Sequence, residues 1–478
     1  MQIPTHLLSL TLQRPRERGL GALLRLTPCL LLAVLLGCAS TDPDKALAQR
    51  VDALLAPLVE AHEFSGAVVL TRHGKVVYQR GVGLANHAAG LAFTAQTPSD
   101  GASMAKTLTA AGLWWLAHEG RVDLDAPVKR YLVAYPHAQT TVRQLLSHSN
   151  GLPADYEAFD PHFKKDEVRS TQAMLAVITQ QAQPPSFVPG TRYEYSNLGY
   201  DVGALLIEQL SGQRYEDFLQ QRFFSRLGMQ ESFVRPARFA DWSGVRTQGY
   251  RWRQGAWLPF EVFDLEGFRG GSNIYFSAQD LSRWASAHAA GTALPAEVSA
   301  SGQRFTQVAG QQTALTGLSW YCEPQRERCY YTGDLNAFYS VAYWDRVRDE
   351  SVVYVSNSSL PAWRRVSLAR GLVDVLAGRP VQQPAPQVFA RFDRDKLAHL
   401  AGSYRRQGLD PVTLIDSGKG LRLRQGQGID YELFAVSSEV LYAPGLDFWL
   451  AFSGAPATKR LHMKSMFVDL VLQRDAGR

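Results

Sequence analysis

Strand-forming segments at the two ends of the main part of the chain constrain its fold more than any other feature. Residues 64–70 and 75–81 are rich in Val and other β-formers and flank an Arg-His-Gly-Lys turn, a pattern typical of a β-hairpin. Similar segments return between 318 and 357, after a stretch to about residue 240 that is mostly helical and irregular. The two groups predict one antiparallel sheet assembled from distant parts of the chain, with a helical region beside it.

The rest of the chain fits an α+β domain followed by a smaller all-β domain. A helix is expected first, because Leu47, Val51, Leu54, Leu55 and Leu58 recur at helical spacing. A further hairpin is predicted around a Gln-Gly turn within residues 249–260. We therefore assign residues 46–377 to the main domain, 378–390 to a Pro- and Gln-rich linker, and 391–478 to a small β-meander or barrel.

The first 37 residues have the layout of a bacterial lipoprotein signal peptide. Four arginines precede the apolar run LTPCLLLAVLLG, which is too short to span a bilayer. The junction Leu-Leu-Gly-Cys resembles a lipobox, so Cys38 is the expected lipidation site and the first residue of the mature chain. Several acyl chains would anchor the protein stably to a membrane on its periplasmic side. Ala39, in place of an aspartate, favours the outer membrane.

Charge and composition argue against nucleic acid as a partner. The formal net charge is +6, but four arginines and one glutamate in the leader account for half of it. The remaining excess is small and scattered along the chain. With 46% hydrophobic and 20% charged residues, the 478-residue chain is typical of a globular protein.

Ser103 and Lys106, within the segment GASMAKTL, form the first candidate catalytic pair. On a helix, residues three apart lie on the same face, so the two side chains would be in contact. Desolvation by Ala102, Met104 and the apolar residues that follow would lower the pKa of the lysine toward neutrality. A neutral amine there could accept the proton of the serine and make its oxygen a nucleophile.

Two further segments supply the other groups that acyl transfer requires. Tyr195 and Asn197 lie in a loop after Pro189 and Gly190. The positive charge of Lys106 would favour the phenolate form of Tyr195, which could then act as a proton shuttle. Asn197 would form hydrogen bonds with Lys106 and with the substrate. Thr332 and Gly333 fall on a strand, where Gly admits a substrate close to the backbone. The amides of Asp334 and Ser103 would then stabilise an oxyanion.

Three other features of the sequence are assigned no part in the reaction. Cys322 and Cys329 bracket a polar loop, and in an oxidising compartment they are expected to form a disulfide. The segments HEFSG and HEGRV lack the second histidine of zinc proteases, and no G-x-S-x-G elbow occurs, so neither a metal nor any other cofactor is expected. His148 is interpreted as a packed, hydrogen-bonded residue rather than a catalytic base.

Taken together, these segments resemble the serine β-lactamases and penicillin-binding proteins. The order S-x-x-K, Y-x-N and a T-G strand is that of the family, and the class C-like branch with its esterases and D-amino-acid peptidases is the most similar. Residues 141–153, 189–212, 223–229 and 270–284 look like further family stretches. The resemblance implies Ser103 as the acylated nucleophile, Lys106 and Tyr195 as shared acid and base, and Asn197 as their orienting residue.

One departure from the family bears on the substrate. Tyr331 occupies the position at which β-lactamases and many related peptidases have Lys or His, immediately before Thr-Gly. The cation that would bind a substrate carboxylate is therefore missing. This favours esterase-like hydrolysis of uncharged esters or amides, with Trp252, Trp257 and Tyr331 contributing an aromatic wall. The alternatives are D,D-carboxypeptidase, D-aminopeptidase or weak β-lactamase activity on cell-wall peptides or β-lactams. An alternative from a non-enzymatic class of function is a wall-binding or sensing lipoprotein that is acylated without turnover.

Overall fold

The computed structural model describes residues 42–475, apart from 154–160, 262–265, 324, 361, 382–396, 407–410, 419, 426–429, 444–447, 456–458 and 465–468. The leader and Cys38 lie outside the described residues, as does most of the 378–390 linker. Among the helices that are described, none combines the length and apolarity needed to cross a membrane.

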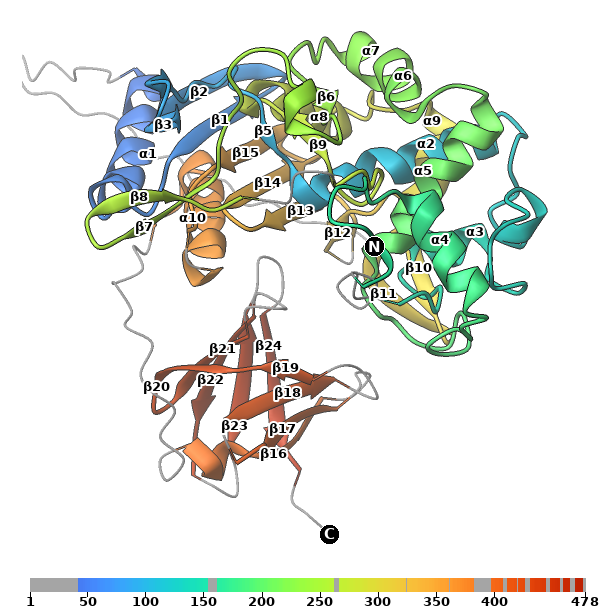
Figure 1. Cartoon of the computed structure of the whole chain (residues 1–478). Coiled ribbons are helices and arrows are strands. Elements are labelled where there is room, and N and C mark those ends of the chain that lie inside the picture. The colour runs from blue at the N-terminus through green and yellow to red at the C-terminus, as the bar shows by residue number, and fades with distance from the viewer. Residues whose placement is uncertain are drawn as a thin grey trace, which may run out of the picture. The chain divides into compact units, whose positions relative to one another are not determined.

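A mixed set of early and late strands forms the central antiparallel sheet (Figure 1). In order across the sheet they are β10 (Phe305–Val308), β11 (Gln311–Thr316), β12 (Tyr321–Cys322), β13 (Arg328–Leu335), β14 (Phe338–Asp345), β15 (Glu350–Ser356), β1 (Gly66–Arg72) and β2 (Lys75–Val82). Strand β1 pairs with β15, placing Gly66 opposite Ser356. The prediction of one sheet built from distant segments is therefore confirmed.

Helices cover both faces of this sheet. On one face α1 (Pro43–Glu60) and α10 (Ala362–Leu376) share a core with Val68 and Tyr354. On the other face α2 (Ala105–His118) and α8 (Ala278–Ala289) pack with Val69 and Val353. Strands β14 and β15 are buried along their whole length, which is why they read as nearly continuous apolar runs rather than alternating ones.

Local sequence explains the first elements. The five residues at helical spacing in α1 are the ones that the structure buries, as predicted. The β1–β2 turn contains His73 and Gly74 with φ values of 51° and 68°. Two consecutive residues at positive φ give the type I′ geometry that suits a tight hairpin.

A helical region and a small sheet lie between β2 and β10 in sequence. The helices there include α3 (Val142–Leu146), α4 (Thr171–Gln180), α5 (Asn197–Ser211), α6 (Tyr215–Leu219), α7 (Ser225–Leu227) and α9 (Ala296–Gly302). The short strands are β3 (Leu84–Asn86), β4 (Leu91–Ala92), β5 (Ser99–Asp100), β6 (Phe233–Val234), β7 (Tyr250–Arg253), β8 (Ala256–Pro259) and β9 (Ile274–Phe276). Strands β7 and β8 form the predicted hairpin. Strand β5 pairs with β9 and ends just before Ser103, so this sheet anchors the nucleophile turn.

The C-terminal part forms a separate antiparallel sheet, as predicted. Its order is β19 (Asp430–Glu432), β18 (Leu421–Gln425), β17 (Val412–Asp416), β16 (Gly402–Arg405), β24 (Asp469–Arg474), β23 (Arg460–Lys464), β22 (Phe448–Ser453), β21 (Val440–Ala443) and β20 (Phe434–Ser437). Leu400, Tyr404, Leu423, Leu450 and Leu461 are among the residues of its own core. A core of this kind is what the regular alternation of short strands and turns predicts.

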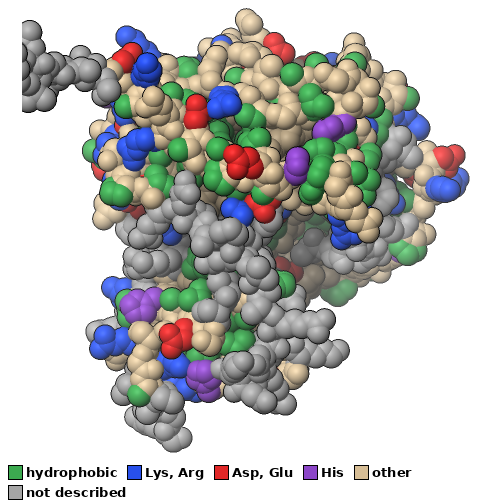
Figure 2. Space-filling model, turned by 90° about the vertical axis from the view of Figure 1, so that its left-hand side faces the viewer, with side chains coloured by type: hydrophobic (Ala, Val, Ile, Leu, Met, Phe, Trp, Pro, Cys, Tyr) green, Lys and Arg blue, Asp and Glu red, His purple; other side chains and the backbone are tan. Residues whose placement is uncertain are grey.

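Charged side chains on the surface are mixed in sign. On the face shown in Figure 2, lysines and arginines are scattered among aspartates and glutamates and do not gather into one stripe. Many are paired, for example Arg72 with Glu350 at 3.0 Å and Arg80 with Asp52 at 2.8 Å. This mixture matches the scattered charge of the sequence.

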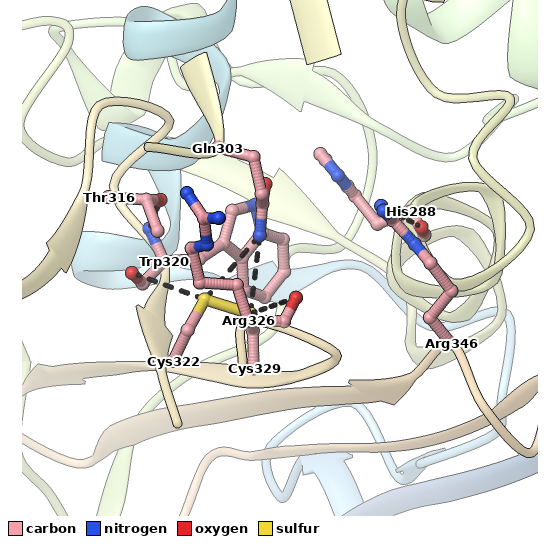
Figure 3. The surroundings of a disulfide bond; sticks show 8 residues. All are labelled: His288, Gln303, Thr316, Trp320, Cys322, Arg326, Cys329 and Arg346. Carbon is pink, nitrogen blue, oxygen red and sulfur yellow. Dashed lines mark hydrogen bonds between the residues drawn. A yellow bond between two sulfur atoms is a disulfide. The ribbon is translucent and has the colours of Figure 1, made fainter. Parts of the chain in front are cut away.

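Cys322 on β12 and Cys329 on β13 are joined by a disulfide (Figure 3). The two residues are direct partners across the strand pair. The side-chain Nε2 of Gln303 lies 3.5 Å and 3.3 Å from the two sulfur atoms. The bond therefore ties the start of β13, the strand that carries Tyr331 to Asp334, to its neighbour.

Replacing both cysteines with alanine is expected to lower the free energy of unfolding by about 2 kcal/mol. The sequence separation is seven residues, and opening so short a loop restores a modest amount of chain entropy to the unfolded state. Urea unfolding of the double variant and of wild type, both without reductant, measures the difference. An unchanged midpoint would contradict the prediction, and wild type with reductant is the matched control.

Candidate active site

The nucleophile candidate lies at a sharp turn between a strand and a helix. Ser103 is in the short 3₁₀ turn η1 (Ala102–Met104), which continues directly into α2. Ala102 has a φ of 47°, and its amide donates to the Asp100 carboxylate at 2.7 Å. The carboxylate therefore stabilises a backbone conformation that residues other than glycine rarely adopt. Ser103 is partly exposed, as access of a substrate to its hydroxyl requires.

Lys106 follows Ser103 after one turn and is completely buried, with 0% of its surface exposed. Its Nζ donates to Ser103 Oγ at 3.0 Å, to Asn197 Oδ1 at 2.6 Å and to the Gly271 carbonyl at 2.7 Å. Desolvation lowers the pKa of Lys106 to about 7, although the charge of Asp201 opposes the shift. The neutral amine is therefore well populated near neutral pH.

The three partners of Lys106 differ in what they can do for a neutral amine. Asn197 Oδ1 and the Gly271 carbonyl can only accept, so they occupy the two N–H groups that a neutral amine retains. The remaining partner, the Ser103 hydroxyl, can donate, and the lone pair of the amine then faces it. The site consequently orients Lys106 to remove the proton of Ser103.

Tyr195 is the third group at this point, with its Oη 2.7 Å from Ser103 Oγ. The Lys106 Nζ lies 5.0 Å from the centre of its ring. The expectation of a phenolate is wrong, because desolvation raises the pKa of Tyr195 to about 12 in spite of the hydrogen bond to Ser103, which lowers it. Tyr195 is thus a neutral phenol near pH 7, able to donate a proton and to accept a hydrogen bond.

The helix after Tyr195 starts earlier than the sequence indicated. Asn197 is the first residue of α5 rather than part of the preceding loop. The Ser196 side chain caps the helix by accepting the Gly199 amide at 3.2 Å. This cap fixes the point where loop becomes helix, and it places Tyr195 and Asn197 on either side of that junction.

Gly271 and Asp201 belong to the site and were not singled out in the sequence. The Gly271 amide donates to Asp201 Oδ1 at 2.7 Å while its carbonyl accepts from Lys106. A Cβ at this position would lie 2.8 Å from Asp201 Oδ1 and 3.0 Å from the Asn197 carbonyl. The close fit explains a glycine here. The only sequence signal was the Gly-Gly pair at the start of the 270–284 stretch.

His148 packs against Tyr195 and is not positioned as the base of Ser103. It is buried, its Nδ1 accepts the Ser196 amide at 3.1 Å, and its ring stacks on Tyr195 at 4.4 Å. Desolvation and the charge of Lys106 lower the pKa of His148 to about 3, so the ring is neutral. Its packed, hydrogen-bonded setting agrees with the sequence interpretation.

Strand β13 lies directly against the nucleophile turn. A Cβ on Gly333 would lie 2.0 Å from the Gly101 carbonyl, and Ser340 Oγ donates to that carbonyl at 2.8 Å. The backbone after Gly333 and the start of η1 are thereby brought together, which is where the amides of Asp334 and Ser103 are required for an oxyanion. Thr332 is half-buried on the same strand.

The three aromatic residues expected to contribute a wall do not form one group of contacting rings. Tyr331 is buried and stacks on Tyr321, with ring centres 5.6 Å apart. Trp252 instead stacks on His62 at 3.8 Å, and Trp257 lies 5.6 Å from His87. In the described part of the chain no ring contact joins either tryptophan to Tyr331, because the β7–β8 hairpin packs against other segments.

Groups of three or more His, Cys, Asp or Glu that could bind a metal ion are absent from the described residues. The chemistry that the site can perform with its own groups is acyl transfer to Ser103. An amine of lowered pKa and a neutral phenol each lie within hydrogen-bonding distance of the Ser103 hydroxyl.

Comparison with known proteins places this geometry in a family. Residues 51–377 match the sequence model of the β-lactamase family. Penicillin-binding protein 4* of Bacillus subtilis is 23% identical and covers 86% of this chain and 95% of its own length. Esterase EstB of Burkholderia gladioli is 28% identical and covers 59% of this chain and 81% of its own length.

Solved structures agree on the fold. The octameric penicillin-binding protein homologue from Pyrococcus abyssi aligns with a TM-score of 0.61 and 20% identity, over 89% of this chain and 99% of that one. A class C β-lactamase aligns with a TM-score of 0.58 and 20% identity, over 71% of this chain and 99% of that one. The chain therefore belongs to the β-lactamase family and is a serine hydrolase of the β-lactamase and penicillin-binding-protein superfamily.

Proposed function

We propose that this serine hydrolase cleaves uncharged esters or amides through an acyl-enzyme on Ser103. The observation that carries the proposal is the environment of Lys106, in which burial and two carbonyl acceptors leave the amine lone pair to the Ser103 hydroxyl. The esterase among the relatives supports this choice of reaction.

Acylation begins when neutral Lys106 takes the proton of Ser103 and Oγ forms a bond to the substrate carbonyl carbon. The amides of Ser103 and Asp334 stabilise the negative oxygen that develops. As the bond to the leaving group breaks, Tyr195 donates its proton to the departing oxygen or nitrogen and regains one from Lys106. Water then attacks the acyl-enzyme, the carboxylic acid departs, and Ser103 recovers its proton.

The absence of a cation before Thr332 supports an uncharged substrate. Tyr331 occupies that position and is buried against Tyr321, so its phenol offers no positive charge to a carboxylate. Carboxylate recognition in a dry site relies on a charge-assisted hydrogen bond. Esters and neutral amides do not need this bond.

A D,D-carboxypeptidase or D-aminopeptidase acting on wall peptides is the second candidate. The observation in its favour is the match to penicillin-binding protein 4*, which extends over 86% of the chain, well beyond the 327 residues of the family model. Weak β-lactamase activity belongs to the same candidate. A receptor that is acylated without turnover is distinguished from both by the time course of product release.

We also propose lipid anchoring through Cys38 on the periplasmic side of the outer membrane. The support is the basic, apolar and small-residue layout of the leader. Metabolic labelling with an alkyne fatty acid in a bacterial host tests it directly. Label is expected in wild type and absent from Cys38→Ala, and equal labelling of the two proteins would contradict the assignment.

The purified chain and its Ser103→Ala variant should be compared on p-nitrophenyl butyrate, a D-Ala-D-Ala peptide and benzylpenicillin. We expect the ester to be turned over fastest and the variant to lose at least about 10³-fold in kcat/KM. Benzylpenicillin turnover at rates near those of the ester would overturn the substrate preference. A burst of one equivalent that then stops would favour the receptor.

A further inference from the structure

Asp334, the residue after Thr332-Gly333, forms an ion pair with Arg365 on α10. The two side chains differ in accessibility, with 55% of the aspartate exposed and 13% of the arginine. A substrate that approaches β13 therefore encounters the carboxylate first. The guanidinium lies beneath it.

Arg365 is held in place by contacts that do not involve Asp334. Its Nε donates to the Leu360 carbonyl at 2.7 Å, and its guanidinium lies 4.6 Å from the centre of the Tyr339 ring. These contacts hold the Arg365 side chain in place, and one of its terminal nitrogens, Nη1, is bound by the Asp334 carboxylate. Removal of the aspartate charge would therefore expose a positioned cation rather than a mobile one.

The pair lies within electrostatic reach of the reacting groups. Asp334 follows Gly333, which packs so closely against the Gly101 carbonyl that it has no room for a Cβ. Gly101 is two residues before Ser103. The negative charge of Asp334 also contributes to the raised pKa of Tyr195, after desolvation as the main cause. The negative charge of Asp334 is thus felt where the substrate must bind, beside Ser103 and Tyr195.

We propose that Asp334 is a specificity-determining residue that excludes substrates bearing a carboxylate near the scissile bond, because it neutralises Arg365 and presents its own negative charge. The inference rests on the proposed function and adds the substrate charge class to it. A carboxylate near β13 would meet a like charge, and the guanidinium of Arg365 is already paired with Asp334. Neutral substrates meet no such barrier.

The test measures how Asp334→Asn changes discrimination between matched esters. One pair is phenyl butyrate and 3-carboxyphenyl butyrate, with the charge on the leaving group. The other is p-nitrophenyl pentanoate and p-nitrophenyl hemiglutarate, with the charge on the acyl group. We expect kcat/KM for the charged ester, relative to its neutral partner, to rise about tenfold in at least one pair. A rise of threefold or less in both pairs would overturn the proposal.

The double variant Asp334→Asn/Arg365→Gln is the matched control, since the gain requires the released guanidinium. The gain should disappear in it, and a gain that persists would also overturn the proposal. Asp334→Ser replaces Asp334→Asn if circular dichroism shows that the latter is unfolded.

A separate readout keeps this proposal independent of ester turnover. Acylation of Ser103 by benzylpenicillin, followed by intact mass spectrometry, should be faster in Asp334→Asn than in wild type. Absence of Ser103-dependent ester hydrolysis in wild type would refute the proposed function, whereas unchanged discrimination and unchanged acylation would refute only the role of Asp334.

Discussion

Replacement of Lys106 by methionine is expected to lower kcat/KM for a neutral ester by about 10³-fold or more. Methionine fills the buried space but has no amine to take the proton of Ser103, and general-base catalysis of this kind contributes about 10²- to 10⁴-fold. The partner contacts at Asn197 Oδ1 and the Gly271 carbonyl would also be lost. Initial rates with p-nitrophenyl butyrate measure the effect.

Lys106→Arg separates the role of the base from the role of positive charge. An arginine keeps the charge but is not deprotonated in proteins, so it cannot serve as the base. We expect it to be as inactive as Lys106→Met. Activity within tenfold of wild type in the arginine variant would contradict the assignment, provided that circular dichroism shows both variants folded.

Gly333→Ala is expected to lower the acylation rate by about 10²-fold or more. The added Cβ would lie 2.0 Å from the Gly101 carbonyl and 2.6 Å from Ser340 Oγ, so β13 must move away from the nucleophile turn. Displacement of reacting groups by about 1 Å is sufficient for a loss of this size. Pre-steady-state release of p-nitrophenol measures acylation directly.

Gly420→Ala is the matched control for this substitution. Gly420 lies in the C-terminal part, and a Cβ there would meet no atom within 4 Å. Its acylation rate should equal that of wild type. If Gly333→Ala acylates within threefold of wild type, then the close contact between β13 and the turn is not required for the reaction.

Local patterns predicted much of this molecule correctly because their consequences are local. Helical spacing identified the buried face of α1, and the Arg-His-Gly-Lys segment identified the β1–β2 turn. The S-x-x-K spacing likewise placed Ser103 beside Lys106, since one helical turn separates them irrespective of the rest of the fold.

The remaining features depend on contacts between remote segments. Lys106 binds the carbonyl of Gly271, 165 residues away, and every residue has a carbonyl, so no residue type signals such an acceptor. The pairing of Asp334 with Arg365 likewise arises from the packing of α10 near β13. The ionisation of Tyr195 was predicted incorrectly because desolvation raises the pKa of its phenol, and burial is a property of the folded chain.

A buried, neutral Lys106 activates Ser103. Because the pKa of Lys106 falls from 10.5 to about 7, the amine is neutral above about pH 7 and protonated below it. The rate of Ser103 modification should therefore rise with pH through about 7 and then level off, falling about tenfold per unit at lower pH.

The most direct measurement is the pH dependence of the rate at which a fluorophosphonate modifies the protein, followed by intact mass and peptide mapping. We expect a single label on Ser103, an inflection near pH 7 in wild type, and slow labelling without that inflection in Lys106→Met. A wild-type rate that is flat between pH 5.5 and 9, or a label on another residue, would contradict this expectation.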